Sequence, residues 1–419
     1  MAELGTASFK IGVDIGDFKN KVEQLKTGFA GAGKTIEANA ASIRKAGLGI
    51  AAFGTAVVAG LGFAVKSAAS FEKGMAKVST LVDTNTESMK KYSNGILKLG
   101  QTVPQSLSEL TEGMYQAISA GVSLGDSIEF VGGAAELAVG GFTEVNVAVD
   151  GMTTVMNAYG DAQSDVNHVM DVFITTQNQG KTTVGALASN LGKVIPIAAN
   201  AGVSFEDLSA AMAALTAGGL STEEAVTALK AVLTGYVKPA KEAKDAAAAM
   251  GIELNASTLK SRGLSGAMDD VSRATGGNID AVSALFPNVR ALTGALSLSG
   301  KMADKYKTSL DAMKDSAGAA KEAFDKMKEA LELKIQMLGS SVEILKVKIG
   351  DVLLPVTKKL VDAVSFIVNG ISDWIDENPM LTRSIVMAAA AIGTLAAAIG
   401  PILILLPNII SGIKTVGWR

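Results

Sequence analysis

The spacing of apolar residues along the chain predicts a protein built almost entirely of helices. From 205 to 215, apolar residues recur every three or four positions, as on one face of an amphipathic helix. These residues are Phe205, Leu208, Met212 and Leu215. By contrast, apolar and polar residues alternate in SFKIGVDI at 8–15, which is typical of a short strand. We therefore expect a mainly α fold, an array of short helices arranged as hairpins, with a small N-terminal strand.

Glycines recur between 70 and 300, and several of them are followed by an apolar residue and then by Ser or Thr. The four examples are Gly121-Val122-Ser123, Gly141-Phe142-Thr143, Gly202-Val203-Ser204 and Gly219-Leu220-Ser221. Glycine adopts the left-handed conformation just past one helix, and the hydroxyl residue caps the next. Asp126, Asp207 and Glu224 follow three residues later, near the capping-box spacing. We expect short helices joined by tight turns, either as a partial solenoid or as an irregular bundle.

Two long apolar runs interrupt this pattern. The run at 46–65 carries no charge and is about as long as a membrane-spanning helix. It contains a stripe of small residues suited to tight helix packing, namely Ala52, Ala56, Gly60 and Ala64. We interpret it either as a membrane-competent helix or as a buried helix of a soluble assembly. The second run, 384–413, is long enough to span a bilayer but is broken by Pro401 and Pro407, which also allows a kinked or re-entrant shape.

Between 301 and 335 the chain is rich in Lys, Glu, Asp and Ala, which predicts a solvated amphipathic helix. It leads into a seam whose steps alternate between four and three residues, the heptad rhythm of a coiled coil. The seam consists of Leu331, Ile335, Leu338, Val342, Leu345 and Ile349. We expect Pro355 to interrupt this helix and a further helix to follow at 360–375.

These patterns divide the chain into five expected segments. They are an N-terminal strand and helix at 1–45, a first apolar helix at 46–69, a helical core at 70–300, amphipathic and heptad helices at 301–378, and a second apolar segment at 384–413. Because the chain stops directly after the last apolar run, we expect it to be a fragment of a longer protein.

Composition and charge exclude several classes of protein. Of 419 residues, 48% are hydrophobic but only 5% aromatic, so the apolar content is mostly small. The absence of cysteine excludes disulfides, thiolate metal sites and cysteine nucleophiles. A single histidine makes a zinc enzyme unexpected, and a net charge of −3 argues against specific nucleic-acid binding. Residues 1–10 lack the features of a signal peptide, so we expect synthesis in the cytoplasm.

One segment matches the phosphate-loop pattern, with Gly28, Gly33, Lys34 and Thr35 at its conserved positions. That loop requires a buried strand before it, whereas the preceding DFKNKVEQLKT is typical of a polar helix. The apolar strands of a parallel sheet are also missing from the sequence. We therefore interpret the match as chance, expect no cofactor or metal, and keep a P-loop NTPase only as a remote alternative.

His168 lies three residues from Asp165 and from Asp171. On a helix, this spacing predicts either a proton relay or an exposed, charged face. No nucleophile or carboxylate pair with supporting context accompanies it, so we expect no catalytic residues and a protein that is not an enzyme.

Four segments in order carry a resemblance to a known family. They are FEKGMAKVSTL at 71–81, VIPIAANAGVSFEDLSAAMAALTAGGLSTEEAVTALKAVL at 194–233, IGDVLLPVTKKLVD at 349–362 and IGPILILLPNII at 399–410. Together with the Ala/Gly/Ser composition, this set resembles the core region of phage tail tape measure proteins, of the type grouped around lactococcal-phage tails. The resemblance extends over roughly 45–413.

The resemblance implies a structural role in the virion tail. Such a protein lies in the lumen of the tail tube, sets the tail length during assembly and leaves ahead of the DNA. The implied partners are the tail tube protein, baseplate or tip hub proteins, tail assembly chaperones, other copies in the lumen and the host inner membrane, with no specific nucleic acid. The family has no general active site. A competing hypothesis, a membrane pore-former of the toxin or bacteriocin kind, uses the same two apolar runs.

Overall fold

The computed structural model describes residues 61–82, 86–160, 165–380, 383 and 387, and within these ranges all regular structure is helical. This confirms the mainly α fold. The predicted strand at 8–15 lies outside the described residues. A first helical stretch covers 61–79. The helices that follow it are α3 (Thr86–Leu99), α4 (Leu107–Ser119), α5 (Ser127–Gly140), α6 (Val145–Tyr159), α7 (Val166–Gln179), α8 (Val184–Leu191), α9 (Ile195–Asn200), α10 (Phe205–Ala217), α11 (Thr222–Val237), α12 (Lys241–Ala249), α13 (Ala256–Thr275), α14 (Ile279–Leu285), α15 (Val289–Ser299), α16 (Ala303–Lys314), α17 (Ala319–Lys328) and α18 (Leu331–Glu377).

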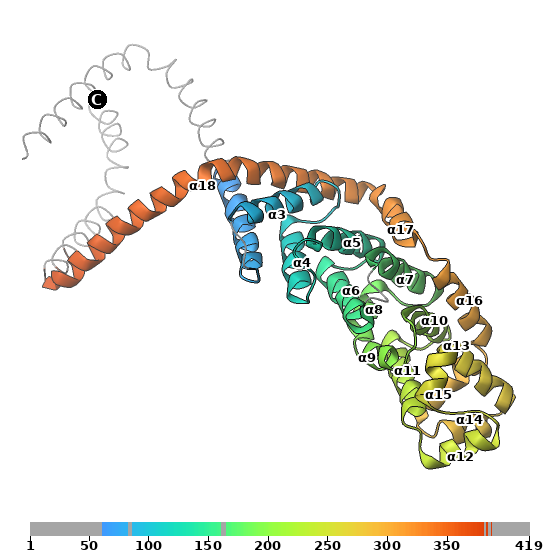
Figure 1. Cartoon of the computed structure of the whole chain (residues 1–419). Coiled ribbons are helices and arrows are strands. Elements are labelled where there is room, and N and C mark those ends of the chain that lie inside the picture. The colour runs from blue at the N-terminus through green and yellow to red at the C-terminus, as the bar shows by residue number, and fades with distance from the viewer. Residues whose placement is uncertain (1–60, 83–85, 161–164, 381–382, 384–386, 388–419) are drawn as a thin grey trace, which may run out of the picture. The chain divides into compact units, whose positions relative to one another are not determined.

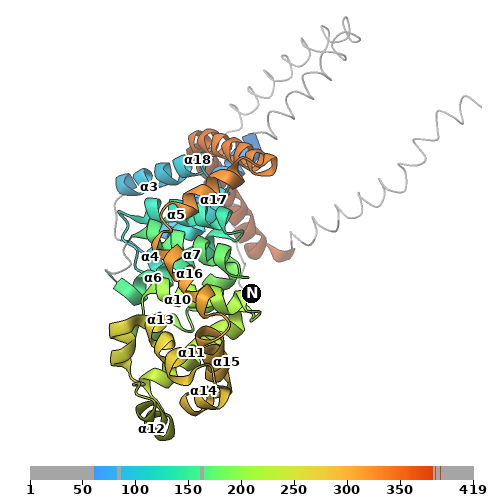
Figure 2. The same ribbon diagram turned by 90° about the vertical axis from the view of Figure 1, so that its right-hand side faces the viewer.

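The chain forms two compact units, Met1–Gly350 and Asp351–Arg419, and α18 begins in the first unit. Within the first unit, the chain runs out along a helical array and then returns along it (Figure 1). On the way out, α6 packs on α4 and α8, α8 on α11, and α11 on α15. On the way back, α16 packs on α10 and α7, and α17 on α7 and α5 (Figure 2). Residues distant in sequence are therefore neighbours throughout this unit.

Helix α10 is the centre of the array and is buried on nearly all sides. It packs against α7, α11, α13 and α16. Its predicted apolar face is fully buried, and so are the alanines on its other side, Ala210, Ala211, Ala213 and Ala214. A helix with apolar or small residues around most of its circumference belongs in the interior. Because these alanine side chains are small, neighbouring helices can approach α10 from every direction. Close helix packing of this kind requires the small apolar residues in which the chain is rich.

The predicted left-handed glycine is confirmed at three of the four turns, and the predicted hydroxyl cap at two of them, Ser204 and Ser221. Ser123 does not cap α5, whose N-cap is Asp126. Gly121, Gly202 and Gly219 have positive φ, at 102°, 78° and 107°. The Ser221 hydroxyl accepts from the Glu224 N–H while the Glu224 carboxylate accepts from the Ser221 N–H, a complete capping box at the start of α11. These turns follow from local sequence because each glycine lacks the Cβ that disfavours the left-handed region.

The fourth turn differs from the prediction. Gly141 has an ordinary φ of −99°, and the left-handed residue is Phe142, with φ 54°. A Cβ at Gly141 would collide with the Val184 side chain on α8. The glycine is therefore required by a close packing contact, and the turn places its conformational strain on the next residue instead.

Phe142→Gly is expected to raise the free energy of unfolding by about 0.5–1 kcal/mol. The phenylalanine is 66% exposed, so little burial is lost, while the left-handed strain of a side chain is removed. Phe142→Ala is the matched control, because it shortens the side chain but keeps the Cβ and the strain. Thermal unfolding of the two variants should separate them, and equal stabilities would contradict a strained Phe142.

Two predictions for the C-terminal third were wrong. Residues 301–335 do not form one helix: α16 ends at Lys314, α17 begins at Ala319, and α18 begins at Leu331. Pro355 does not interrupt the chain either, because α18 continues through it to Glu377. Proline removes one backbone hydrogen bond, and a long helix of otherwise favourable residues tolerates that loss as a local defect.

The apolar runs lie largely outside the described residues. Of the small-residue stripe, Ala52, Ala56 and Gly60 lie there, whereas Ala64 is buried at the start of the described chain. A Cβ built on Gly350 of α18 would meet the Ala64 carbonyl and the Ala68 methyl, so α18 passes this helix at close range. Among the described residues, none of the helices combines the length and the apolar character needed to cross a bilayer.

Candidate functional site

Two buried carboxylates, Asp171 and Asp207, join the outgoing helices to later parts of the chain. Both are almost fully buried, and both accept hydrogen bonds from backbone N–H groups far away in sequence. We call them the carboxylate clasps. They are the two buried acidic side chains among the described residues, and both accept hydrogen bonds from the segment that returns along the array.

Asp171 on α7 caps a helix to which it is not connected locally. One of its oxygens accepts from the Gly318 N–H and the other from the Ala320 N–H, each at 2.8 Å. The first N–H groups of a helix have no partner inside it, and the helix dipole favours a negative charge there. Asp171 therefore stabilises the start of α17, where Gly318 adopts a left-handed φ of 85° and separates this helix from α16.

Asp207 on α10 binds two segments at once. Its Oδ2 accepts from the Leu264 N–H at 2.6 Å, and both oxygens lie within 3.2 Å of the Ser265 nitrogen. Its Oδ1 accepts from the Tyr306 hydroxyl of α16 at 2.6 Å. The backbone of α13 turns sharply at Gly263, where φ is 69°, so the carboxylate reaches the N–H groups of a new helical run.

Burial is the main influence on the Asp207 carboxyl and raises its pKa above the ordinary value. The hydrogen bonds from Tyr306, Ser265 and Leu264 act in the opposite direction, because they stabilise the ionised form. Burial and the adjacent Asp207 also raise the pKa of the Tyr306 hydroxyl, so this group stays a hydrogen-bond donor. The site is built from donors around one carboxylate and holds no nucleophile.

The Asp207 arrangement goes beyond what the sequence predicted. Ser204 does cap α10 by accepting from the Asp207 N–H at 3.2 Å. The carboxylate, expected near this capping box, is turned instead toward α13 and α16. The local sequence does not predict that Asp207 contacts Leu264, because tertiary packing alone brings these residues together. The one sequence signal of an unusual backbone at this point of α13 is Gly263.

Neither interpretation of His168 is correct. Asp165 caps α7 by accepting from the Asn167 N–H at 2.9 Å, and Asp171 is a carboxylate clasp. The His168 Nε2 instead lies 2.6 Å from Glu206 Oε1, and its side chain is 33% exposed. Glu206 comes from α10, so the pair joins two packed helices rather than forming a relay with either aspartate.

The predicted heptad seam lies on the outside of α18. All six residues, Leu331, Ile335, Leu338, Val342, Leu345 and Ile349, are exposed in the structure. The chain buries a different set in this helix, Ser340, Ile344 and Val347. Pairing of the seam with another helix stays a prediction. The phosphate-loop residues Gly28, Gly33, Lys34 and Thr35 lie outside the described residues.

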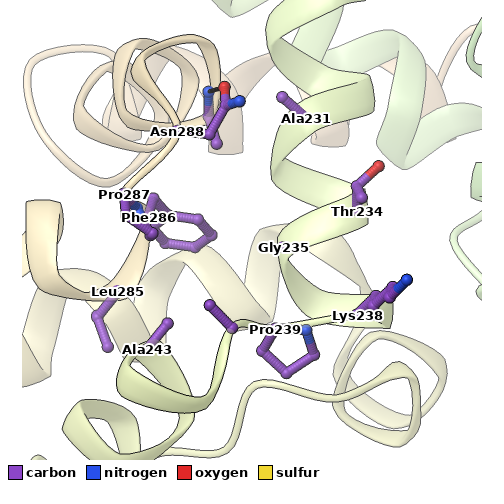
Figure 3. A pocket seen from close by; sticks show the side chains of 12 residues that line it. Ala231, Thr234, Gly235, Lys238, Pro239, Ala243, Leu285, Phe286, Pro287 and Asn288 are labelled. Atoms are coloured by element: carbon purple, nitrogen blue, oxygen red, sulfur yellow. Dashed lines mark hydrogen bonds between the residues drawn. The ribbon is translucent and has the colours of Figure 1, made fainter.

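The described residues carry several hollows, with volumes from about 330 to 650 Å³. One hollow of about 330 Å³ lies beside α11, where Gly235 and Pro239 face Phe286 and Pro287 (Figure 3). Its walls are mostly apolar and bring no group of charged side chains together. Within the described ranges, His, Asp and Glu residues also do not gather in any set that could hold a metal ion.

Comparison with known protein families indicates which class of protein this chain resembles. Residues 93–287, which include the second half of α3 and everything through α14, match the family described as Phage-related minor tail protein. Over this range, the chain is therefore similar to phage-related minor tail proteins. No solved structure matches it.

Three curated relatives are all described as tape measure proteins or probable tape measure proteins, which is a more specific description than minor tail protein. A "Probable tape measure protein" of Clostridium phage phiCD119 is 29% identical over 66% of this chain and 30% of its own length. The "Tape measure protein" of Pneumococcus phage Dp-1 is 23% identical over 82% of this chain and 30% of its own. A "Probable tape measure protein" of Escherichia phage P2 is 24% identical over 92% of this chain and 48% of its own. The resemblance to phage tail tape measure proteins is thus confirmed, although the chain spans only a third to a half of these relatives.

Proposed function

We propose that this chain is part of a protein that lies in the lumen of a phage tail tube and sets the length of the tail during assembly. The observation that carries the proposal is the similarity to tape measure proteins along most of the chain. The helical fold of the described residues supports a structural role. On this proposal the protein leaves the tube ahead of the DNA at infection.

The proposed partners are the tail tube protein, the baseplate or tip hub proteins and the tail assembly chaperones. The exposed apolar residues of α18 support such contacts, because a protein enclosed by partners does not need a polar surface. Contact with the host inner membrane rests on the sequence of the two apolar runs alone. No observation favours the pore-forming or nucleotide-hydrolysing alternatives over the tail role.

Changing the length of α18 tests the ruler role. In the phage gene, two extra copies of the three-heptad segment 331–351 are inserted after Asp351, beyond the folded array, so that the faces of α18 stay in register. At about 1.5 Å per helical residue, tails should lengthen by roughly 60 Å. Electron micrographs of purified virions give the tail lengths.

A deletion provides the matched opposite change. Removing 352–372, three heptads of α18, should shorten tails by roughly 30 Å. Because both changes avoid the array, assembly itself should continue. Tails of unchanged length in both variants would contradict the ruler role, while length changes of opposite sign would support it.

A further inference from the structure

The hollow beside α11 has an apolar floor and reaches the protein surface. Leu285 and Phe286 are buried in its wall, whereas Thr234 and Pro287 beside them are exposed. Gly235 leaves the α11 side of the wall without a side chain, and the Phe286 ring faces it (Figure 3). An apolar cavity of roughly 150 Å³ binds benzene. A hollow of about 330 Å³ therefore has room for a large apolar side chain.

Basic side chains surround this hollow. We considered the charged residues that line it or directly adjoin a lining residue within 230–292, a range that the structure describes without a gap. They are the cations Lys230, Lys238, Lys241, Lys244 and Arg290 and the single acidic residue Glu242, all of them exposed. The whole chain carries a net charge of −3, so this local excess of positive charge runs against the overall balance.

None of these five cations forms an ion pair with another described residue. Other exposed lysines of the array do have acidic partners, as Lys77 has in Glu112 at 2.7 Å and Lys193 has in Glu223 at 3.1 Å. The cations around the hollow therefore attract an acidic partner whose charge the surrounding chain does not already supply.

The first turn of α12 adds hydrogen-bond donors at the same place. Ala240 and Ala243 both line the hollow, so the start of this helix borders it. Ala240 precedes the helix and has no side chain that accepts a hydrogen bond, so the first N–H groups of α12 are not capped. These donors and the positive end of the helix dipole favour a carboxylate there.

We propose that the hollow binds an acidic peptide segment of another protein, which seats one large apolar side chain in the hollow and pairs the carboxylates on either side of it with the surrounding cations. A buried apolar anchor with charges around it is the usual arrangement of a peptide-binding site. The cations belong to α11, α12, α15 and the link between α11 and α12, so they are distributed around the opening. A fatty acid or lipid carries its charge at one end only and matches this distribution less well. The inference rests on the hollow and its charges and does not depend on the tail role.

Peptide binding to the full chain tests the proposal. The probe is a fluorescently labelled peptide with a central phenylalanine and glutamates on both sides, and fluorescence anisotropy measures its affinity. We expect saturable binding that weakens as salt is added, because exposed charges are screened. Two control peptides separate the contributions: alanine in place of the phenylalanine, and lysines in place of the glutamates, should each weaken binding at least tenfold.

Charge reversal in the chain locates the site. Lys238→Glu combined with Arg290→Glu is expected to weaken binding of the peptide at least tenfold, because two attractions become repulsions. Both residues are exposed, so circular dichroism should show unchanged helix content. Lys90→Glu combined with Lys91→Glu is the matched control: these lysines are exposed on α3, at the other end of the array from α12 (Figure 1), and their reversal should leave binding within twofold of wild type.

Three results would overturn the proposal. If the peptide did not bind, or if both double variants weakened binding equally, the hollow would not be the site. If the alanine peptide bound as tightly as the phenylalanine peptide, the contact would be with surface charge and not with the hollow. If vesicles of phosphatidylglycerol bound the chain through Lys238 and Arg290 and the peptide did not, the occupant would be a lipid surface. Each of these results would leave the tail role standing, since that role is measured by tail length.

Discussion

Phe205→Ala is expected to lower the free energy of unfolding by about 3–5 kcal/mol. Phe205 is fully buried at the start of α10, and its ring lies 5.5 Å from that of Phe173 and 6.1 Å from that of Tyr159. Removing the ring leaves a cavity between α6, α7 and α10 that close-packed helices cannot fill. Urea denaturation followed by circular dichroism measures the loss.

Phe63→Ala is the matched control for this change. Its ring is 62% exposed on the helix over 61–79, so the same substitution should cost less than about 0.5 kcal/mol. If the two variants unfolded at the same urea concentration, α10 would not be the centre of a cooperative array.

Asp207→Ala is expected to lower the free energy of unfolding by about 2–4 kcal/mol. Three donors, the N–H groups of Leu264 and Ser265 and the Tyr306 hydroxyl, would lose their acceptor in the interior. Removing a buried charge offsets part of this cost. Hydrogen exchange should show faster exchange of the Leu264 and Ser265 amides in the variant, because the clasp no longer protects them.

Asp311→Ala serves as the control for the carboxylate. Asp311 also lies on a helix packed against the array, but its side chain is 73% exposed and pairs with Lys314 at 3.3 Å. Exposed ion pairs contribute little, so this change should be close to neutral. A loss as large as that of Asp207→Ala would contradict the role assigned to burial.

The same carboxylate predicts a pH dependence with a definite sign. Burial raises the pKa of Asp207 in the folded chain above its ordinary value of 3.8, so the folded state holds the proton more firmly than the unfolded state. The contribution of this group to stability is therefore fully present below about pH 4 and is lost as pH rises through the folded pKa. Asp207→Asn removes this titration. A wild-type chain whose stability relative to Asp207→Asn rises over that range would contradict the assignment.

Much of the fold could be predicted from local sequence, for a physical reason. The periodicity of Phe205, Leu208, Met212 and Leu215 and the turns at Gly121, Gly202 and Gly219 depend on interactions within a few residues. Helix faces, caps and left-handed glycines are set by the backbone geometry of short segments. The resemblance to tape measure proteins likewise came from ordered local motifs, and the family match at 93–287 confirmed it.

By itself, then, the sequence determined a helical array of small residues with capped turns and a heptad stripe in its last long helix. Only the tertiary structure decided where Asp171 and Asp207 point, which carboxylate caps α17, and which side of α18 faces out. Asp171 lies 147 residues from Gly318, and Asp207 lies 99 residues from Tyr306. A buried carboxylate accepts hydrogen bonds from any donor that packing brings near it. The packing of the helices, after the chain returns along the array, decides which donors lie near, and local sequence does not specify that packing.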